Sequence, residues 1–269
     1  ADVVVTCTAA TAPLFDGTLV PEHATVVAMG SHTTDARETD DALARRATVA
    51  VESRDSAARE AGDVTLAIDS GALAGIEDTV TLAELVAGVP RDVVVLIDEA
   101  YLDFVTDPRA GDALTLLAGA PNLVVSRTFS KAHALAGMRV GYLVCEPGLA
   151  AAIRSVSTPF GVNLPAQAAA TVALGQGELA RTAERSAAVA AERDRVVEAL
   201  RTQGWQVPEA QGNFFWLGAG QQTTTLAEHF RAAGILVRPF AGEGVRVSVG
   251  TTSDNERVLA AAAAWRAEH

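Results

Sequence analysis

The chain has 269 residues, of which 49% are hydrophobic and 20% are charged, and its formal net charge is -12. This composition is typical of a globular protein with one large or two smaller domains. The acidic balance argues against nucleic acid and anionic membranes as partners, and no stretch is apolar for long enough to cross a membrane.

The two cysteines, Cys7 and Cys145, lie far apart in the sequence. We expect both to be small buried hydrophobic residues of a reduced, cytoplasmic protein. The chain opens directly in a strand-like run, without an initial Met and without the basic region of a signal peptide. This opening is typical of a fragment.

Short valine-rich runs alternate with helical patterns in the first third of the chain. We predict strands at 2–8, 24–30, 48–52 and 63–68, and helices at 40–46, 56–61 and 81–87. Continuous apolar strands that alternate with helices are typical of a parallel sheet covered on both faces.

Three further buried strands are predicted at 93–98, 123–127 and 140–144, with a loop around 107–111 and a short helix at 114–118. The fold class that follows is α/β, with a mostly parallel sheet and helices on both of its faces. A smaller C-terminal α+β domain is expected to follow this sheet.

The last part changes character. It has a helix at 165–174 that starts with proline, and a long helix at 178–203 that Gly204 ends. Four short strands are predicted after it, at 205–207, 213–217, 236–238 and 245–249. Two helices lie between and after them, each starting at a predicted capping box, Thr225-x-x-Glu228 and Ser253-x-x-Glu256.

Lysine occurs only once in this chain, at position 131. A coding bias toward arginine explains the rarity, and it makes the remaining lysine informative. Arginine does not lose its proton in a protein, whereas a lysine amine can do so and act as a nucleophile. Lys131 is therefore a candidate catalytic residue, with a solvated surface lysine as the alternative.

Polar groups follow two of the buried strands, at the edge where open α/β sheets bind ligands. They match what pyridoxal 5'-phosphate (PLP) needs: an amine for the Schiff base, an anion for the pyridine nitrogen, a phenol for the ring oxygen, and a hydroxyl and a guanidinium for the phosphate. The residues that supply this set are Lys131, Asp98, Tyr101, Ser130 and Arg139. Asp98 alone is equally typical of a turn cap.

The segments 98–101 and 127–142 resemble fold-type I aminotransferases, most closely the histidinol-phosphate and aromatic amino acid aminotransferases. The similarity covers about residues 88–269 and continues through 159–163, 211–216, 237–240 and 244–250. It implies transfer of an amino group between an amino acid and a 2-oxo acid, with Lys131 as the catalytic and PLP-carrying residue.

The same resemblance implies that Arg246 and Asn213 bind the substrate, and that Arg246 grips its α-carboxylate. A surface arginine on a strand is the alternative for Arg246. The resemblance also implies a homodimer and no bound metal. In these families a large segment with further cofactor contacts precedes the strand that ends at Asp98, and its counterpart is not found before residue 88.

Residues 1–88 resemble instead the second half of the NAD-binding domain of the ornithine cyclodeaminase/mu-crystallin family. The matching motifs are Pro13–Gly17, Met29–His32, Asp35–Glu38 and Glu60–Asp63. The glycine-rich dinucleotide loop is absent, so NAD is not expected, and His32 is interpreted as a loop residue.

The chain therefore resembles a junction of two truncated enzymes near residues 87–90. We expect a partial Rossmann-like segment at 1–88, a PLP-binding segment at 89–175 and a small C-terminal domain at 176–269. We hypothesise that the first segment docks in place of the missing part of the aminotransferase sheet. The expected function is that of a PLP-dependent aminotransferase, impaired by the missing part. The alternatives are an NAD(P)-dependent oxidoreductase or cyclodeaminase, and a non-catalytic chimeric scaffold.

Overall fold

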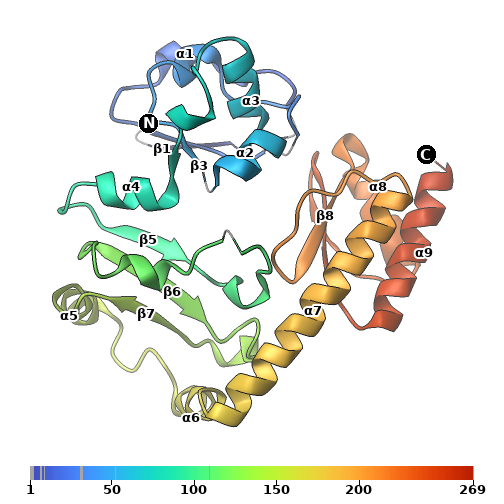
Figure 1. Ribbon diagram of the computed structural model, residues 1–269. Coiled ribbons are helices and arrows are strands. Elements are labelled where there is room, and N and C mark those ends of the chain that lie inside the picture. The colour runs from blue at the N-terminus through green and yellow to red at the C-terminus, as the bar shows by residue number, and fades with distance from the viewer. Residues whose placement is uncertain are drawn as a thin grey trace.

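The computed structural model describes residues 3–6, 8, 10–30, 33–51, 53–108 and 110–268. Cys7 and His32, and the ends Asp2 and Glu52 of two predicted strands, lie outside the described residues. Figure 1 shows three parts: a front part (residues 3–88), a central layer of three strands, and a C-terminal part that the long helix α7 (Gln176–Thr202) joins to the rest.

The front part contains two separate pairs of parallel strands. One pair is β1 (Val3–Thr6) with β2 (Thr25–Ala28), and the other is β3 (Ala50–Val51) with β4 (Val80–Thr81). The helices are α1 (Asp41–Ala44), α2 (Arg54–Glu60), α3 (Gly62–Asp69) and α4 (Leu82–Gly88), with 3-10 turns η1 (Gly17–Leu19) and η2 (Ile76–Asp78).

The strand predicted at 63–68 is wrong, because this segment is helix α3. Val64 and Ala67, one helical turn apart, are both buried in a cluster with Leu73. The backbone N–H of Thr39 donates to the Asp63 carboxylate over 2.7 Å, which fixes the start of the helix. Tertiary packing thus overrides the preference of this β-branched run for a strand.

The central layer is a three-stranded sheet in the order β5-β6-β7, formed by β5 (Val95–Asp98), β6 (Leu123–Thr128) and β7 (Gly141–Cys145). β5 and β6 are parallel, whereas β7 runs antiparallel to β6. The 3-10 turns η3 (Leu102–Phe104), η4 (Ala113–Leu116) and η5 (Ala136–Met138) lie in its loops. Helix α5 (Pro147–Val156), which was not predicted, and α6 (Leu164–Ala173) follow the sheet.

The front strands do not hydrogen-bond to this central sheet within the described residues, so they do not extend it. That the front part docks in place of the missing part stays a prediction. Figure 1 shows α4 between the rest of the front part and β5. Among the described residues of the front part, only those of α4 share the central core, where Val86 packs with Leu123 and Val125. The side chain of Asn122 donates to the Val93 carbonyl over 2.7 Å, which fixes the segment between α4 and β5.

The prediction of three buried strands is confirmed only for the first half of β6. Leu123 and Val125 are inaccessible to solvent, whereas Leu96 of β5 is 61% exposed and Leu143 of β7 is 48% exposed. The mixed α/β architecture is confirmed, but its parallel strands form three small sheets in place of one covered sheet.

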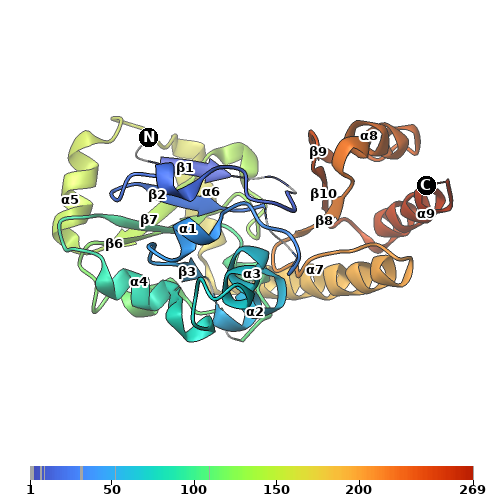
Figure 2. The same cartoon turned by 90° about the horizontal axis from the view of Figure 1, so that it is seen from above.

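Helix α7 (Gln176–Thr202) connects the C-terminal part to the rest of the chain. Figure 2 shows the C-terminal part extending to one side. Its sheet is antiparallel, in the order β8-β10-β9. The elements are β8 (Phe214–Gly218), η6 (Gly220–Gln222), α8 (Thr223–Ala232), β9 (Arg238–Phe240), β10 (Gly244–Ser248) and α9 (Thr252–Glu268).

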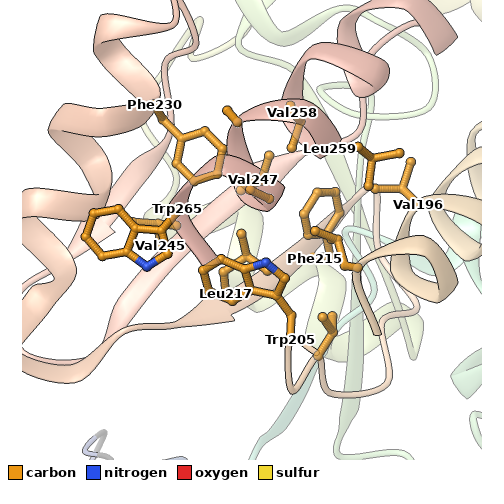
Figure 3. Packing of buried hydrophobic residues seen from close by; sticks show 14 of the residues in the cluster. Val196, Trp205, Phe215, Leu217, Phe230, Val245, Val247, Val258, Leu259 and Trp265 are labelled. Carbon is orange, nitrogen blue, oxygen red and sulfur yellow. The ribbon is translucent and has the colours of Figure 1, made fainter. Parts of the chain in front are cut away.

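The hydrophobic core of this part lies between its sheet and the helices α7, α8 and α9. Phe215, Phe230 and Trp265 belong to it (Figure 3), and the first two are inaccessible to solvent. Burial of each such side chain contributes about 1.5–3 kcal/mol to folding. This core makes the C-terminal part a stable support for the residues on β8 and β10.

Three details of the C-terminal prediction are wrong. Residues 205–207 are not a strand, because the Trp205 N–H closes the end of α7 on the Leu200 carbonyl. Thr225 lies inside α8 and does not cap it. Helix α9 is capped by Thr251, whose hydroxyl accepts from the Asp254 N–H, two residues before the predicted Ser253.

Within the described part of the chain, no helix is long and apolar enough to cross a membrane. The same residues contain no group of three or more His, Cys, Asp or Glu side chains that could hold a metal ion.

Candidate active site

Asp98, the last residue of β5, is paired with Ser126 of the parallel strand β6. The Ser126 hydroxyl donates a 3.0 Å hydrogen bond to Asp98 Oδ1, and the Ala100 N–H donates to the same oxygen over 3.1 Å. These two bonds orient the carboxylate and leave Oδ2 without a hydrogen bond from the described residues. Asp98 thus offers a fixed negative charge at the ligand-binding edge of the sheet.

Lys131 lies beside Tyr101 at this edge. Its Nζ is 5.1 Å from the centre of the Tyr101 ring, within the range of a cation–π contact, and both side chains are half-buried. The backbone N–H of Ala134 donates to the Lys131 carbonyl over 2.9 Å, which closes a tight turn. This turn directs the chain away from β6 directly after Lys131.

Ser130 and Arg139 border the loop that joins β6 to β7. The Ser130 N–H donates to the Thr128 hydroxyl over 3.1 Å, and Arg139 donates to the Ala136 carbonyl over 2.8 Å. Arg139 has a left-handed backbone, with φ of 54°. Its side chain is exposed, and it makes no hydrogen bond to another candidate residue among those described.

Arg246 projects from β10 of the C-terminal part. Its guanidinium carbon lies 4.9 Å from the centre of the Phe214 ring, and it makes no hydrogen bond or ion pair with the other described residues. Phe214 in turn packs edge-to-face on Tyr101, with ring centres 5.2 Å apart. The two rings therefore connect Arg246 with Lys131.

Asn213 lies directly before β8. Its backbone carbonyl accepts from the Val249 N–H over 2.9 Å, which ties the segment before β8 to the segment after β10. Its side chain is half-buried and makes no hydrogen bond to other described residues. Asn213 is therefore available to a ligand next to Phe214.

A cavity of about 1150 Å³ opens beside these rings. Asp98, Tyr101 and Phe214 line it, together with residues of α2 and α4 of the front part. Among the described residues, Lys131 and Arg246 do not line the cavity, but each contacts a ring that does. The front part therefore supplies one wall of the candidate site.

An ion network behind Asp98 was not predicted as part of the site. Arg127 donates to Glu99 Oε2 over 2.9 and 2.8 Å and to Asp112 Oδ1 over 2.7 Å. Burial opposes its charge, but these carboxylates raise the pKa of Arg127 above its usual value. Both Glu99 and Arg127 lie inside the motifs that carry the aminotransferase resemblance. Their positions in the sequence, next to Asp98 and Ser126, are the signal from which this network could have been predicted.

A second unpredicted network holds the front part together. Glu38 is inaccessible to solvent, and its carboxylate accepts from the hydroxyls of Thr6 and Thr8 over 2.8 Å each, and from the Gly30 N–H over 2.8 Å. Burial would raise the pKa of Glu38, but the bonds from Gly30, Thr6 and Thr8 lower it below its usual value. The motif residues Gly30 and Glu38 thus join the ends of β1 and β2.

A family model described as "Aminotransferase class I and II" matches residues 70–262, which is well over half of the chain. The chain belongs to this family. A second model, "Ornithine cyclodeaminase/mu-crystallin family", matches residues 1–91. The two matches overlap at 70–91, the segment that contains α4 and its contact with the central core.

Several curated relatives are aromatic amino acid aminotransferases. The one from Thermobifida fusca is 48% identical over 181 residues, and the one from Streptomyces avermitilis is 47% identical over the same length. Each alignment covers 67% of this chain and 50% of the relative. The chain therefore spans about half the length of the curated relatives it matches.

Solved structures share the fold of almost the whole chain. A putative histidinol-phosphate aminotransferase from Erwinia carotovora has a TM-score of 0.65 at 21% identity, and the match covers 99% of this chain and 74% of the other. The histidinol-phosphate aminotransferase from Sinorhizobium meliloti, solved in complex with pyridoxal-5'-phosphate, has a TM-score of 0.64 at 22% identity, covering 99% and 70%. These similarities place the chain in the same fold.

Proposed function

We propose that this chain binds PLP through Lys131 and takes part in amino-group transfer between an amino acid and a 2-oxo acid. The observation that carries the proposal is the Lys131 amine, 5.1 Å from the centre of the Tyr101 ring, at the sheet edge where Asp98 ends β5. The oriented carboxylate, the phenol and the amine match the chemistry of the cofactor. Ser130 and Arg139, on the loop beside them, would serve its phosphate.

PLP, when bound, supplies an electron sink for reactions at the α-carbon of an amino acid. In the proposed site, the Asp98 carboxylate would keep the pyridine nitrogen protonated, and the Tyr101 hydroxyl would donate to the ring oxygen. The Nζ of Lys131 would carry a proton to and from the substrate, a role that its single amine on a flexible stem suits.

Arg246 would bind the substrate carboxylate. Its guanidinium has no protein partner for hydrogen bonding among the described residues, and the Phe214 ring supports it from one side. A planar guanidinium binds a carboxylate through two parallel hydrogen bonds. Asn213 lies next to Phe214 and would add a further polar contact to the substrate.

Titration of the native chain with PLP tests this proposal. We expect a visible absorption band, and, after reduction with borohydride, a cofactor label on the peptide that contains Lys131. Lys131→Ala should abolish both signals, whereas Ser157→Ala, a change on the exposed surface, should leave them unchanged. A label of equal yield in Lys131→Ala would contradict the proposal.

For the front part we propose a structural role and no NAD binding. Its motif residues Gly30 and Glu38 hydrogen-bond to each other, and Asp63 Oδ1 accepts from the N–H groups of Glu38 and Thr39, which supports this assignment. NADH fluorescence should therefore remain unquenched on addition of the native chain. Saturable quenching would favour the oxidoreductase or cyclodeaminase function in its place.

We also propose that the chain forms a homodimer through the surface of α6 and the loop before it. Phe160, in the loop before α6, is 99% exposed, and Leu164 and Val172 of α6 are largely exposed. Exposed apolar side chains that gather on one surface are typical of protein interfaces. Light scattering after gel filtration should give a dimer mass for the native chain and a monomer mass for Phe160→Asp.

The proposed place of action is the cytoplasm. Cys145 carries a free thiol, and a reducing compartment keeps such a thiol unmodified. Titration with a thiol reagent should therefore detect Cys145 as reduced in protein purified without reductant under inert gas.

A further inference from the structure

Arg193, on α7, is the largest side chain in the described chain that is inaccessible to solvent. Its acidic partner is its sequence neighbour Asp194, which accepts from Nε over 2.8 Å and is itself mostly exposed. A buried guanidinium is costly, and an apolar residue of the same size often serves stability equally well. The remaining contacts of Arg193 therefore point to a role beyond stability.

Those contacts lead to two loops on different parts of the molecule. Nη1 donates to the carbonyls of Phe104 over 2.9 Å and Gly212 over 3.2 Å, and Nη2 donates to the Thr106 hydroxyl over 3.0 Å. Phe104 and Thr106 follow β5 in the central layer, whereas Gly212 precedes β8 in the C-terminal part. One buried side chain thus joins the two parts from the helix that connects them.

Gln211 joins the same two loops independently. Its Oε1 accepts from the N–H of Thr106 over 2.8 Å and from the N–H of Asp107 over 3.2 Å. The 104–107 loop is therefore bonded to the 211–212 segment at several points. The hydrogen bonds of Arg193 in addition fix both loops to α7.

Each loop carries one ring of the candidate site. Tyr101 lies three residues before Phe104, and Phe214 lies two residues after Gly212. Gly212 is packed closely on its neighbour, because a Cβ on it would lie 2.9 Å from Cε1 of Phe214. A shift of either loop would therefore move Tyr101 relative to Phe214, and with them the side chains that these rings support, Lys131 and Arg246.

We infer that Arg193 is a positioning residue of the active site: it fixes the spacing between the Tyr101–Lys131 side and the Phe214–Arg246 side. This inference rests on the proposed function where it concerns the cofactor. The effect of Arg193 on the two loops is independent of any ligand and is measurable without one.

Arg193→Met and Arg193→Lys test the inference, with Arg181→Met on the exposed surface of the same helix as the matched control. We expect Arg193→Met to raise the dissociation constant for PLP at least tenfold. It should also raise amide hydrogen exchange in 102–107 and 211–214 at least tenfold. Arg193→Lys keeps the charge but reaches fewer acceptors, so its dissociation constant and its exchange rates should lie between those of Arg193→Met and the native chain. Arg181→Met should have the values of the native chain.

Native PLP affinity in folded Arg193→Met, or exchange that rises equally along the whole of α7, would overturn the inference. If Arg193→Met does not fold, Gln211→Leu and Gln211→Glu replace it, since the second keeps an acceptor for the Thr106 N–H. Gln211→Leu should then raise exchange in 102–107 and weaken PLP binding, and equal behaviour of the two variants would count against the inference. If the native chain itself binds no PLP, the proposed function fails and exchange in the two loops alone decides the role of Arg193.

Discussion

The hydroxyl of Ser126 donates a 3.0 Å hydrogen bond to the carboxylate of Asp98, its paired residue on the adjacent parallel strand. The bond crosses the sheet at the edge where the candidate site lies. It fixes the orientation of the charge that is proposed to face the pyridine nitrogen of PLP, and it allows the roles of charge and orientation to be separated by mutation.

Asp98→Asn should weaken PLP binding by about tenfold to a hundredfold, because a hydrogen bond to a charged group contributes about 1.5–3 kcal/mol. Ser126→Ala leaves the charge in place and should weaken binding by only a few fold. Absorbance titration with PLP measures both. Equal losses in the two variants would mean that orientation, and not charge, is what Asp98 contributes.

Arg246→Lys should raise KM for an amino acid substrate about tenfold or more, because lysine cannot form the two parallel bonds of a guanidinium with a carboxylate. PLP affinity should not change. Arg238→Lys is the matched control, since Arg238 is the paired residue on β9 and lies over a different ring, that of Phe240. A similar rise in KM in both variants would contradict a specific role for Arg246.

Ala134→Gly should stabilise the protein. Ala134 has φ of 58°, a left-handed conformation that costs a residue with a Cβ about 1–2 kcal/mol and costs glycine little. After the entropic penalty of glycine, we expect a gain of about 0.5–1 kcal/mol, seen as a higher midpoint in thermal unfolding. Ala136→Gly, at a position without positive φ, should lower the midpoint, and a gain in both variants would refute the explanation.

Glu38 should make the front part sensitive to acid. Its pKa in the folded chain lies below its ordinary value of 4.5, so its contribution to stability is present above that value and is lost as pH falls through the lowered folded pKa. Glu38→Gln should therefore destabilise the chain at pH 7 by about 1–3 kcal/mol and flatten the decline in acid. Urea unfolding at pH 7 and below pH 4.5 checks this, with the exposed Glu22→Gln as the control that should keep the native profile.

Local sequence patterns identified most elements and the main candidate residues. The capping box of Thr81 and Glu84 starts α4 as the pattern at 81–87 indicates, and Gly204, with φ of 88°, ends α7. These features depend on neighbours in the sequence, so they are readable without a structure. Helix α3 was predicted as a strand because the secondary structure of this segment depends on packing partners that are distant in the sequence.

The sequence by itself determined which residues gather at the sheet edge. Asp98 and Lys131 each follow an apolar strand, and neighbouring parallel strands place their carboxyl ends side by side. The single lysine and its motif then indicated the family, and the match at 70–262 confirms it.

Only the tertiary structure decided how the two halves of the site are joined. The contact of Tyr101 with Phe214 bridges more than a hundred residues of sequence, and the guanidinium of Arg193 reaches Phe104 and Gly212 from a helix that is contiguous with neither. No periodicity or short motif encodes such contacts, because they arise when α7 folds the C-terminal part back toward the central layer. The separate sheets could not be predicted for the same reason, because the pairing of the strands depends on how α4 packs between the front strands and β5.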